Sequence, residues 1–384
     1  MLYAKSIASE SNAENTQKFH LFGDPTLRLL MPKNVASIDS VNGRSTSNIV
    51  ALKSLAHVPI EGAMKLNDGK PMASFQGKGT LQVFDSQRDV VLQDGKGTFR
   101  FKENGSLLYR GGVSIHGGQF ETTIPIPKDV TFGNKSRISM YAWNDATDGA
   151  GYTENVFING IDSTAAIDTI GPQISIYLDD LNFHPGDVVK SNPTMIVRLN
   201  DESGINTSTV GVGHQLSATI SNPEQTFDLS NYYQSDPDTY KSGEARYYLH
   251  DLSDGKHTIH IKAWDVHNNS SEAETYFEVS AADDLAMLNI VNYPNPFSNS
   301  TTFTFQRNGI EPINVDIRIF SIAGRLIGKI TVEDITDRSV RIPWDGRDHD
   351  GDRLANGIYL YKLIAHSQNG QHTSETIGKL AVVR

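Results

Sequence analysis

Closely spaced acidic residues mark one stretch near the C-terminal end of this 384-residue sequence. The stretch WDGRDHDGDRLANG contains a D-x-D-G-D pattern, in which several carboxylates could offer hard oxygen ligands to calcium. No Glu stands where an EF-hand loop would place its bidentate ligand, and RLANGIYLYKL predicts a turn followed by a strand. Two interpretations stay open, a calcium site and a hairpin turn, and we favour the turn; the four candidate ligands are Asp345, Asp348, Asp350 and Asp352.

Two further groups of polar residues could bind a metal. The stretch WNDATDGAGYTEN offers Asn144, Asp145, Asp148 and Glu154. These residue types also favour turns and solvent, which is the interpretation we prefer. His257 and His260 are three residues apart in a predicted strand, so their side chains should point to opposite faces and cannot share a metal.

Nucleophilic chemistry has little support in these residues. The sequence contains no cysteine, which excludes disulfides, thiolate metal sites and a cysteine nucleophile from the chain. Its 12 histidines would allow a Ser-His-Asp arrangement, but no G-x-S-x-G turn is present. We therefore expect that this chain is not a hydrolase.

Composition narrows the class of protein. The 38% apolar and 21% charged residues are ordinary for folded globular domains. A net charge of -11, with Lys and Arg scattered singly, disfavours nucleic-acid binding. No apolar run reaches the roughly 18 to 20 residues of a transmembrane helix, and the first 30 residues lack the plan of a signal peptide. We therefore expect that any export signal lies elsewhere or is absent.

Short alternating runs dominate from about residue 46 onward and predict an all-β fold. Examples are TLQVFD at 80–85, RISMYAW at 137–143, HTIHIKAW at 257–264 and VDIRIFS at 315–321. Each run has one apolar face for a core.

An internal repeat suggests how these strands group. Residues 138–158 and 259–279 both contain a strand, an Ala-Trp pair, a polar turn and a second strand, with Trp143 and Trp264 at the end of the first strand. Such a hairpin usually closes an immunoglobulin-like sandwich. We predict two tandem immunoglobulin-like β-sandwiches at 35–165 and 172–282, with a linker around Gly171-Pro172. A second linker follows, and the remaining residues, 285–384, are numerous enough for a third sandwich.

The first 34 residues differ from the rest. LYAKSIASESNAENTQKF can form a helix, and Gly23-Asp24-Pro25 is a turn signal before the strand-like TLRLLM. One helix and one strand cannot bury each other, so we expect 1–34 to be a short α/β remnant of a domain whose sheet lies elsewhere.

Three segments of the last domain resemble the C-terminal sorting domain of the Bacteroidetes type IX secretion system. They are YPNPFSNSTTFTF (293–305), VDIRIFSIAGRLIGKI (315–330) and WDGRDHDGDRLANGIYLYKL (344–363), and the chain ends in GKLAVVR. The last segment is also similar to the immunoglobulin-like domain of flagellar hook-capping proteins. Ser321 stands where the family usually has Asp before its Gly, here Gly324.

The opening stretch FGDPTLRL resembles the end of the gingipain-family cysteine peptidase domain. Together with two sandwiches and a sorting-type domain, the layout resembles the C-terminal half of type IX secretion sortases. The resemblance implies a full-length cysteine endopeptidase that cleaves sorting domains with a Cys nucleophile and a His base. Neither catalytic residue maps onto this chain, so we expect no catalysis from it, and no cofactor beyond the calcium considered above.

The resemblance also implies a location and a partner. It predicts an exported protein held peripherally at the outer membrane or cell surface, with a sorting domain that an outer-membrane shuttle barrel recognises. One face of the strand GIYLYKLIA should be core, but its tyrosines and the closing strand could instead dock onto this partner. The candidate docking residues are Tyr359, Tyr361, Lys379, Leu380 and Val382.

A second hypothesis belongs to a different functional class. The chain would then be a type IX-secreted cargo or adhesin, whose sandwiches bind glycan or protein and whose last domain serves only for export. A gingipain-like domain upstream of residue 1 would favour the first hypothesis over this one.

Overall fold

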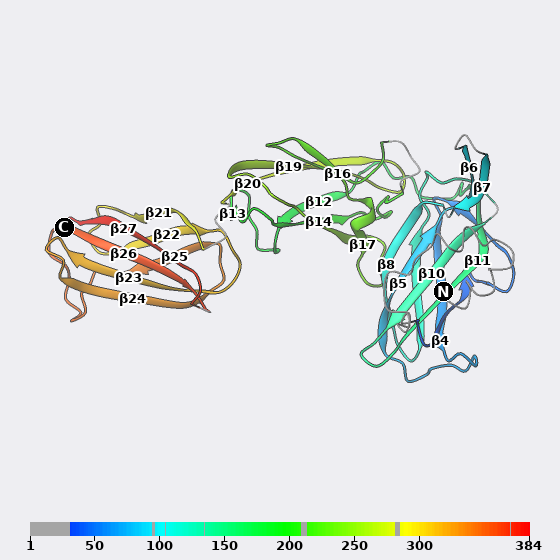
Figure 1. Ribbon diagram of the computed structural model, residues 1–384, viewed down its shortest axis with the longest axis horizontal. Helices are drawn as coiled ribbons and strands as arrows, with labels where there is room; N and C mark the ends of the chain where they lie inside the picture. The colour runs from blue at the N-terminus through cyan, green and yellow to red at the C-terminus, as the bar shows by residue number, and fades with distance from the viewer. Residues whose placement is uncertain are drawn as a thin grey trace.

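The computed structural model describes residues 31–93, 97–103, 105–133, 135–208, 213–280, 285–368 and 370–384. The predicted α/β remnant at 1–34 lies almost entirely outside the described residues. Their regular secondary structure is almost entirely β-strand, with one short 3-10 helix, η1 (Ser230–Tyr232). The predicted all-β class is therefore confirmed. Figure 1 shows three sandwiches following one another along the long axis of the molecule.

The first sandwich packs a four-stranded sheet, in the order β2-β1-β4-β9, against five strands in the order β8-β5-β10-β11-β3. Alternation places Leu81 and Val83 of one strand and Ile138 and Met140 of its neighbour in a common core. The strands are β1 (Val35–Val41), β2 (Arg44–Ser45), β3 (Val50–Ser54), β4 (His57–Lys65), β5 (Gly77–Phe84), β8 (Leu107–Ile115), β9 (Gln119–Pro125), β10 (Ser136–Trp143) and β11 (Asp148–Ile161).

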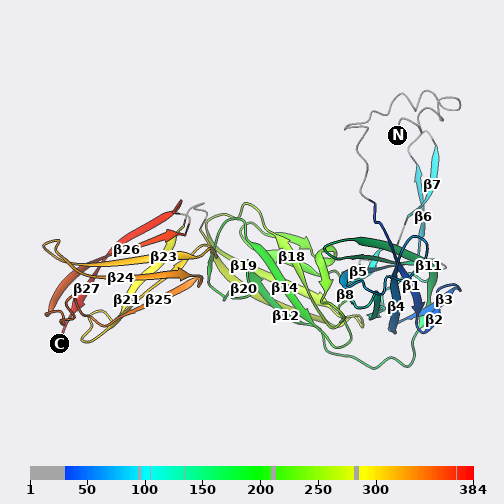
Figure 2. The same ribbon diagram turned by 90° about the horizontal axis from the view of Figure 1, so that it is seen from below.

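A separate hairpin extends from this sandwich. Its strands, β6 (Arg88–Gln93) and β7 (Thr98–Glu103), pair only with each other and project from the body of the domain in Figure 2.

The second sandwich is built from the strand orders β12-β14-β18-β17 and β13-β20-β19-β15-β16. The buried residues that form its core come from the sequence range 178–279. The strands are β12 (Gln173–Leu178), β13 (Val188–Val189), β14 (Thr194–Asn200), β15 (Ser217–Ile220), β16 (Gln225–Asp228), β17 (Tyr233–Ser235), β18 (Ser242–Tyr248), β19 (Gly255–Trp264) and β20 (Ser270–Val279).

The predicted internal repeat corresponds to two hairpins. β10 pairs antiparallel with β11, and β19 pairs antiparallel with β20. Trp143 and Trp264 are the last residues of β10 and β19, as the sequence predicts.

One sheet continues from the first sandwich into the second, which the sequence did not predict. β17 pairs in parallel with β8 at Ser235 and Gly111, so nine strands form one sheet. Next to this pair, the backbone N–H of Asp238 donates to the Gly112 carbonyl at 3.0 Å, and its carboxylate accepts from the Ser114 N–H at 2.7 Å. Backbone bonds across the joint connect the two sandwiches.

The third sandwich packs β21-β22-β25 against β24-β23-β26-β27. Phe303, Ile317 and Leu363 are fully buried between the two sheets, and Trp344 contacts Phe303 with ring centroids 6.3 Å apart. The strands are β21 (Met287–Tyr293), β22 (Thr301–Arg307), β23 (Ile313–Ser321), β24 (Leu326–Ile335), β25 (Ser339–Trp344), β26 (Gly357–Ser367) and β27 (Thr373–Val382).

A buried arginine joins the third sandwich to the second. The guanidinium of Arg338 donates to the carbonyls of Val188 and Leu178, at 3.2 and 3.1 Å, and to the carboxylate of Asp179 at 3.2 Å. Asp180 adds a second carboxylate at 3.5 Å. The planar guanidinium holds its N–H donors in a rigid arrangement, so it can bond to several carbonyl and carboxylate oxygens at once.

Candidate functional site

Three of the five predicted docking residues lie in the core of the third sandwich. Tyr361, Leu380 and Val382 are 4%, 1% and 1% exposed, and the Tyr361 ring packs against Phe303 at a centroid distance of 5.0 Å. The tyrosine-bearing face of β26 therefore faces the opposite sheet. Buried side chains of this kind stabilise the fold and offer no contact to a partner in this conformation.

The two other predicted docking residues lie nearer the surface. Lys379 is exposed on β27. Tyr359 is half-buried, and its hydroxyl donates to the Ala355 carbonyl at 3.0 Å. Exposed apolar side chains appear instead at positions that the sequence analysis did not single out, with Ile377 68% and Ile358 54% exposed.

The end of the C-terminal edge strand is covered by the segment YPNPF. The Asn295 side chain donates to the Lys379 carbonyl at 3.0 Å and accepts from the Ala381 N–H at 2.9 Å. Phe297 then pairs with the strand end, donating to the Ala381 carbonyl at 3.0 Å and accepting from the Val383 N–H at 2.9 Å. One part of the sequence motif therefore protects a sheet edge.

The earlier half of β27 remains the edge of its sheet among the described strands. The backbone C=O of Lys379 and the N–H of Ala381 point away from β26. In an antiparallel strand every second residue points its backbone groups to the same side, so the N–H and C=O of Ile377 also point away from β26. An outward row of N–H and C=O groups can accept an added strand. The exposed Ile377 side chain lies on this same strand.

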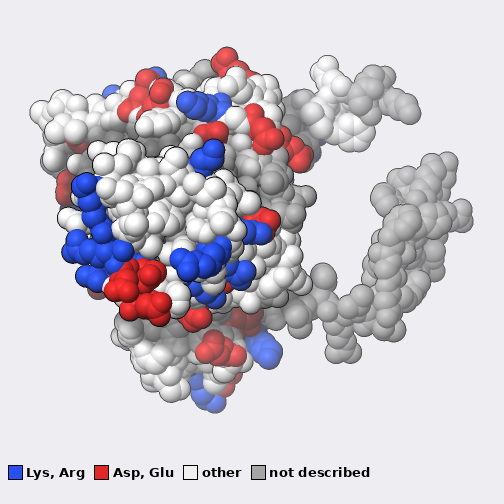
Figure 3. Space-filling view, turned by 90° about the vertical axis from the view of Figure 1, so that its left-hand side faces the viewer, with Lys and Arg blue, Asp and Glu red and all other residues white. Residues whose placement is uncertain are grey.

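A shallow groove lies over the three-stranded sheet of the same domain. It encloses about 660 Å³ and is lined by Tyr293, Thr302, Thr304, Gln306 and Arg341, among others. Tyr293 is 77% exposed. Figure 3 shows the molecule from the end of this sandwich, where acidic and basic side chains surround an uncharged centre and neither sign dominates.

The acidic run at 345–352 forms a turn. The Asp348 carboxylate accepts from the N–H groups of Asp350 and Asp352 at 3.0 and 2.9 Å. The Asp345 carboxylate accepts from the N–H of Arg347 at 3.2 Å. Gly346 and Gly351 adopt positive φ, as such turns require. The geometry agrees with the turn interpretation of these four residues.

The second polar stretch is also occupied by local bonds. Asn144 accepts from two backbone N–H groups of its own turn, at 3.0 Å each. Asp148 accepts from the Tyr141 hydroxyl at 3.0 Å, and Glu154 pairs with Lys135. Asp145, the fourth candidate, lies exposed in the turn.

His257 and His260 lie on opposite faces of β19, as predicted. His257 is 1% exposed, and its ring nitrogens lie 2.9 and 2.7 Å from the carbonyls of Ser221 and Ser253. The side chain of His260 is 41% exposed and contacts Glu272.

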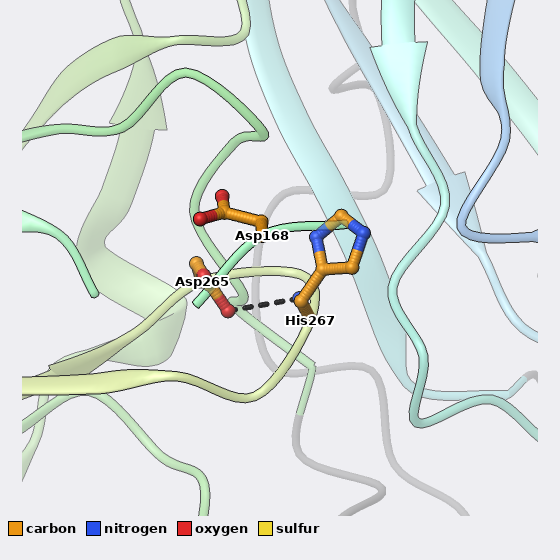
Figure 4. A group of neighbouring side chains, drawn as sticks. All are labelled: Asp168, Asp265 and His267. Carbon is orange, nitrogen blue, oxygen red and sulfur yellow. Dashed lines mark hydrogen bonds between the residues drawn. The ribbon is translucent and has the colours of Figure 1, made fainter. Parts of the chain in front are cut away.

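One group of ligand-type side chains does come together in the described part of the chain. Asp168, Asp265 and His267 place one candidate ligand atom each within 4.8 Å of the others (Figure 4). Asp265 and His267 come from the turn between β19 and β20, and Asp168 comes from the connector before β12. No local sequence pattern predicts this group, because its members belong to two distant segments and the local signal is limited to the polar turn after Trp264.

Comparison with known proteins identifies the last domain. Residues 291–377 match the family model of the secretion system C-terminal sorting domain. None of the curated proteins matches the chain. Among the described residues we find no helix with the length and apolar character needed to cross a membrane.

Solved structures similar to the chain include dimeric latent PorU from Porphyromonas gingivalis. The match covers 99% of this chain and 37% of that one, with 27% sequence identity and a TM-score of 0.43. This chain thus spans little more than a third of that protein. A 1.5-MDa bacterial ice-binding adhesin matches over 92% of this chain and 99% of its own, with 13% identity and a TM-score of 0.21.

The family match agrees with the three motif segments and with the closed strand edge that one of them builds. The chain therefore carries, at residues 291–377, a C-terminal sorting domain of the type IX secretion system, which implies an exported protein of the cell surface or outer membrane.

Proposed function

We propose that this chain is the non-catalytic C-terminal segment of a type IX secretion sortase-like cysteine peptidase. Its sorting domain docks the protein onto the outer-membrane shuttle barrel, and the two preceding sandwiches act as spacers. The observation that carries this proposal is the sorting-domain match at 291–377. The FGDPTLRL segment, which resembles the end of a gingipain-family peptidase domain, supports the assignment to a sortase.

The absence of cysteine motivates the non-catalytic part of the proposal. A cysteine peptidase needs a thiolate to form its acyl-enzyme, and this chain has none. Incubation of the purified chain with peptides that span a sorting-domain cleavage site should leave them intact. Cleavage by the pure chain would contradict this part of the proposal.

The surface that best fits docking is the open edge of β27 around Ile377. Backbone groups directed outward provide main-chain hydrogen bonds, and the exposed Ile377 side chain provides an apolar contact beside them. A partner strand would extend the sheet β24-β23-β26-β27 by one.

One experiment tests whether the sorting domain docks onto the barrel, and a second tests whether docking occurs by strand addition at the β27 edge. Deletion of 285–384 should abolish pulldown by the shuttle barrel, and binding that survives this deletion would refute docking through the sorting domain. Within the intact chain, Ile377→Pro removes an outward N–H, whereas Ile377→Ala keeps it and serves as the matched control. We expect Ile377→Pro to weaken binding at least about tenfold more than Ile377→Ala. Equal binding by the two variants would exclude strand addition at this edge.

A further inference from the structure

The joint between the first and second sandwiches contains a compact group of ligand-type side chains. Asp265 and His267 lie two residues apart in the β19–β20 turn, and Asp168 approaches them from the connector (Figure 4). Their candidate ligand atoms all lie within 4.8 Å of one another. Two carboxylates and one imidazole are a common set of protein ligands for a divalent ion.

The imidazole of His267 has an unusual environment. Both of its ring nitrogens are buried, and neither has a hydrogen-bond partner. Leaving a buried polar group unpaired costs about 1–3 kcal/mol, so native structures rarely tolerate it. A metal ion would give one ring nitrogen a partner, because a neutral imidazole binds metal ions through a ring nitrogen. The two carboxylates nearby could bind the same ion.

Three carboxylates gather at this point, and the imidazole of His267 lies beside one of them, Asp168. Asp265 is fully buried, and Asp201, 7% exposed, lies close enough for the two carboxylates to affect each other. In the described part of the chain, no Lys or Arg forms an ion pair with Asp168, Asp201 or Asp265. A cation would offset this concentration of negative charge.

The turn holds its ligands in place and still leaves room for coordination. Asp265 accepts from the N–H groups of His267 and Asn269 through one oxygen, at 2.8 and 2.7 Å, and from the Asn269 amide through the other, at 2.6 Å. That second oxygen retains a lone pair. Such a turn also has a purely structural use, which explains the Asp265 bonds but not the unpaired ring of His267.

The same turn contacts both sandwiches and their connector. The Val266 carbonyl accepts from the Lys128 N–H at 2.9 Å, and the Asn268 amide donates to the Asp129 carboxylate at 3.0 Å. The Asn269 amide donates to the Asp168 carbonyl at 3.1 Å, across 101 positions of sequence. An ion at this point would therefore link the connector to the turn that already contacts the first sandwich.

We propose that Asp168, Asp265 and His267 bind a divalent transition-metal ion, of the class of Zn²⁺ or Mn²⁺, that fastens this joint. The imidazole selects against calcium, which takes six to eight oxygen ligands. The function of the ion is structural: it holds the connector against the turn that contacts the first sandwich. This site is independent of the docking surface on the third sandwich.

Titration calorimetry on the metal-stripped full chain tests the proposal. Zn²⁺, Mn²⁺ and Ca²⁺ should each be titrated into wild type, His267→Ala and Asp168→Asn, with His260→Ala as the control for loss of another histidine of the same hairpin. Asp168→Asn retains an acceptor for the Ile170 N–H, which Asp168 binds at 3.0 Å, so it should fold normally. We expect one saturable site in wild type and His260→Ala, and at least about a tenfold weaker Kd in the two site variants.

Limited proteolysis of the connector provides a second readout. Residues 162–172 include Ile167 and Ile170, which are 94% and 76% exposed, so they are accessible to protease. The metal should slow cleavage there in wild type and in His260→Ala but not in His267→Ala or Asp168→Asn. Absence of saturable binding, equal binding by all four proteins, or binding of Ca²⁺ alone would each overturn the proposal.

Discussion

Arg338 should fasten the sorting domain to the second sandwich, and its removal should destabilise the third sandwich. The side chain is 4% exposed and donates to two carbonyls and to Asp179, at 3.1 to 3.2 Å. Truncating one partner of a buried charged network costs about 3–5 kcal/mol, because the remaining charges stay unpaired. The side chains of Asp179 and Asp180 are 21% and 30% exposed, so water recovers part of that loss. We expect Arg338→Ala to cost about 3 kcal/mol.

The assay is urea unfolding followed at Trp344, which lies in the core of the third sandwich. Replacing Trp143 and Trp264 by Phe leaves Trp344 as the only tryptophan of the 3 in the chain, and selective excitation of tryptophan avoids the 14 tyrosines. With an m-value of about 1–3 kcal/mol/M, a loss of about 3 kcal/mol should lower the midpoint by roughly 1–3 M.

Arg341→Ala is the matched control for this experiment. Arg341 is exposed on β25, three residues from Arg338, and its truncation should change the free energy of unfolding by less than about 0.5 kcal/mol. If Arg338→Ala and Arg341→Ala unfold at the same urea concentration, the buried guanidinium does not couple the two sandwiches and the reasoning fails.

Three further outcomes follow from the same structure. The guanidinium of Arg307 is fully buried and donates to four backbone carbonyls. One ammonium group cannot reach all four carbonyls, so Arg307→Lys should lower the free energy of unfolding by about 2–4 kcal/mol in the Trp344 assay. Gly151→Ala would place a Cβ 2.2 Å from the Ala36 carbonyl oxygen and should lower the Tm by several degrees, whereas Gly97→Ala, with nothing within 4 Å, should not. Burial raises the folded-state pKa of Asp201, so its stabilising contribution is present below pH 3.8 and is lost as the pH rises through the raised pKa; Asp201→Asn should remove this component from a stability-versus-pH series.

Local sequence patterns were sufficient to predict the strands. Alternating side chains must separate into two faces, so runs such as 257–264 predicted β19, and the polar turns after Trp143 and Trp264 predicted two hairpins. The motif segments of 293–363 likewise pointed to the sorting domain that the family match identifies.

The sequence was less informative about which side chains remain accessible. Tyr361, Leu380 and Val382 were docking candidates because aromatic and apolar residues favour both cores and interfaces. Their burial follows from which face of the sheet meets its partner, and only the packed structure decides this.

The sequence by itself determined the all-β class, the repeated hairpins and the sorting domain, because each depends on residues close together in the chain. Tertiary structure alone decided the sheet that continues from β8 to β17, the insertion of Arg338 beside Asp179, which is 159 positions away, and the meeting of Asp168 with the Asp265–His267 turn. These features depend on how whole sheets dock, and no local pattern of side chains specifies that geometry.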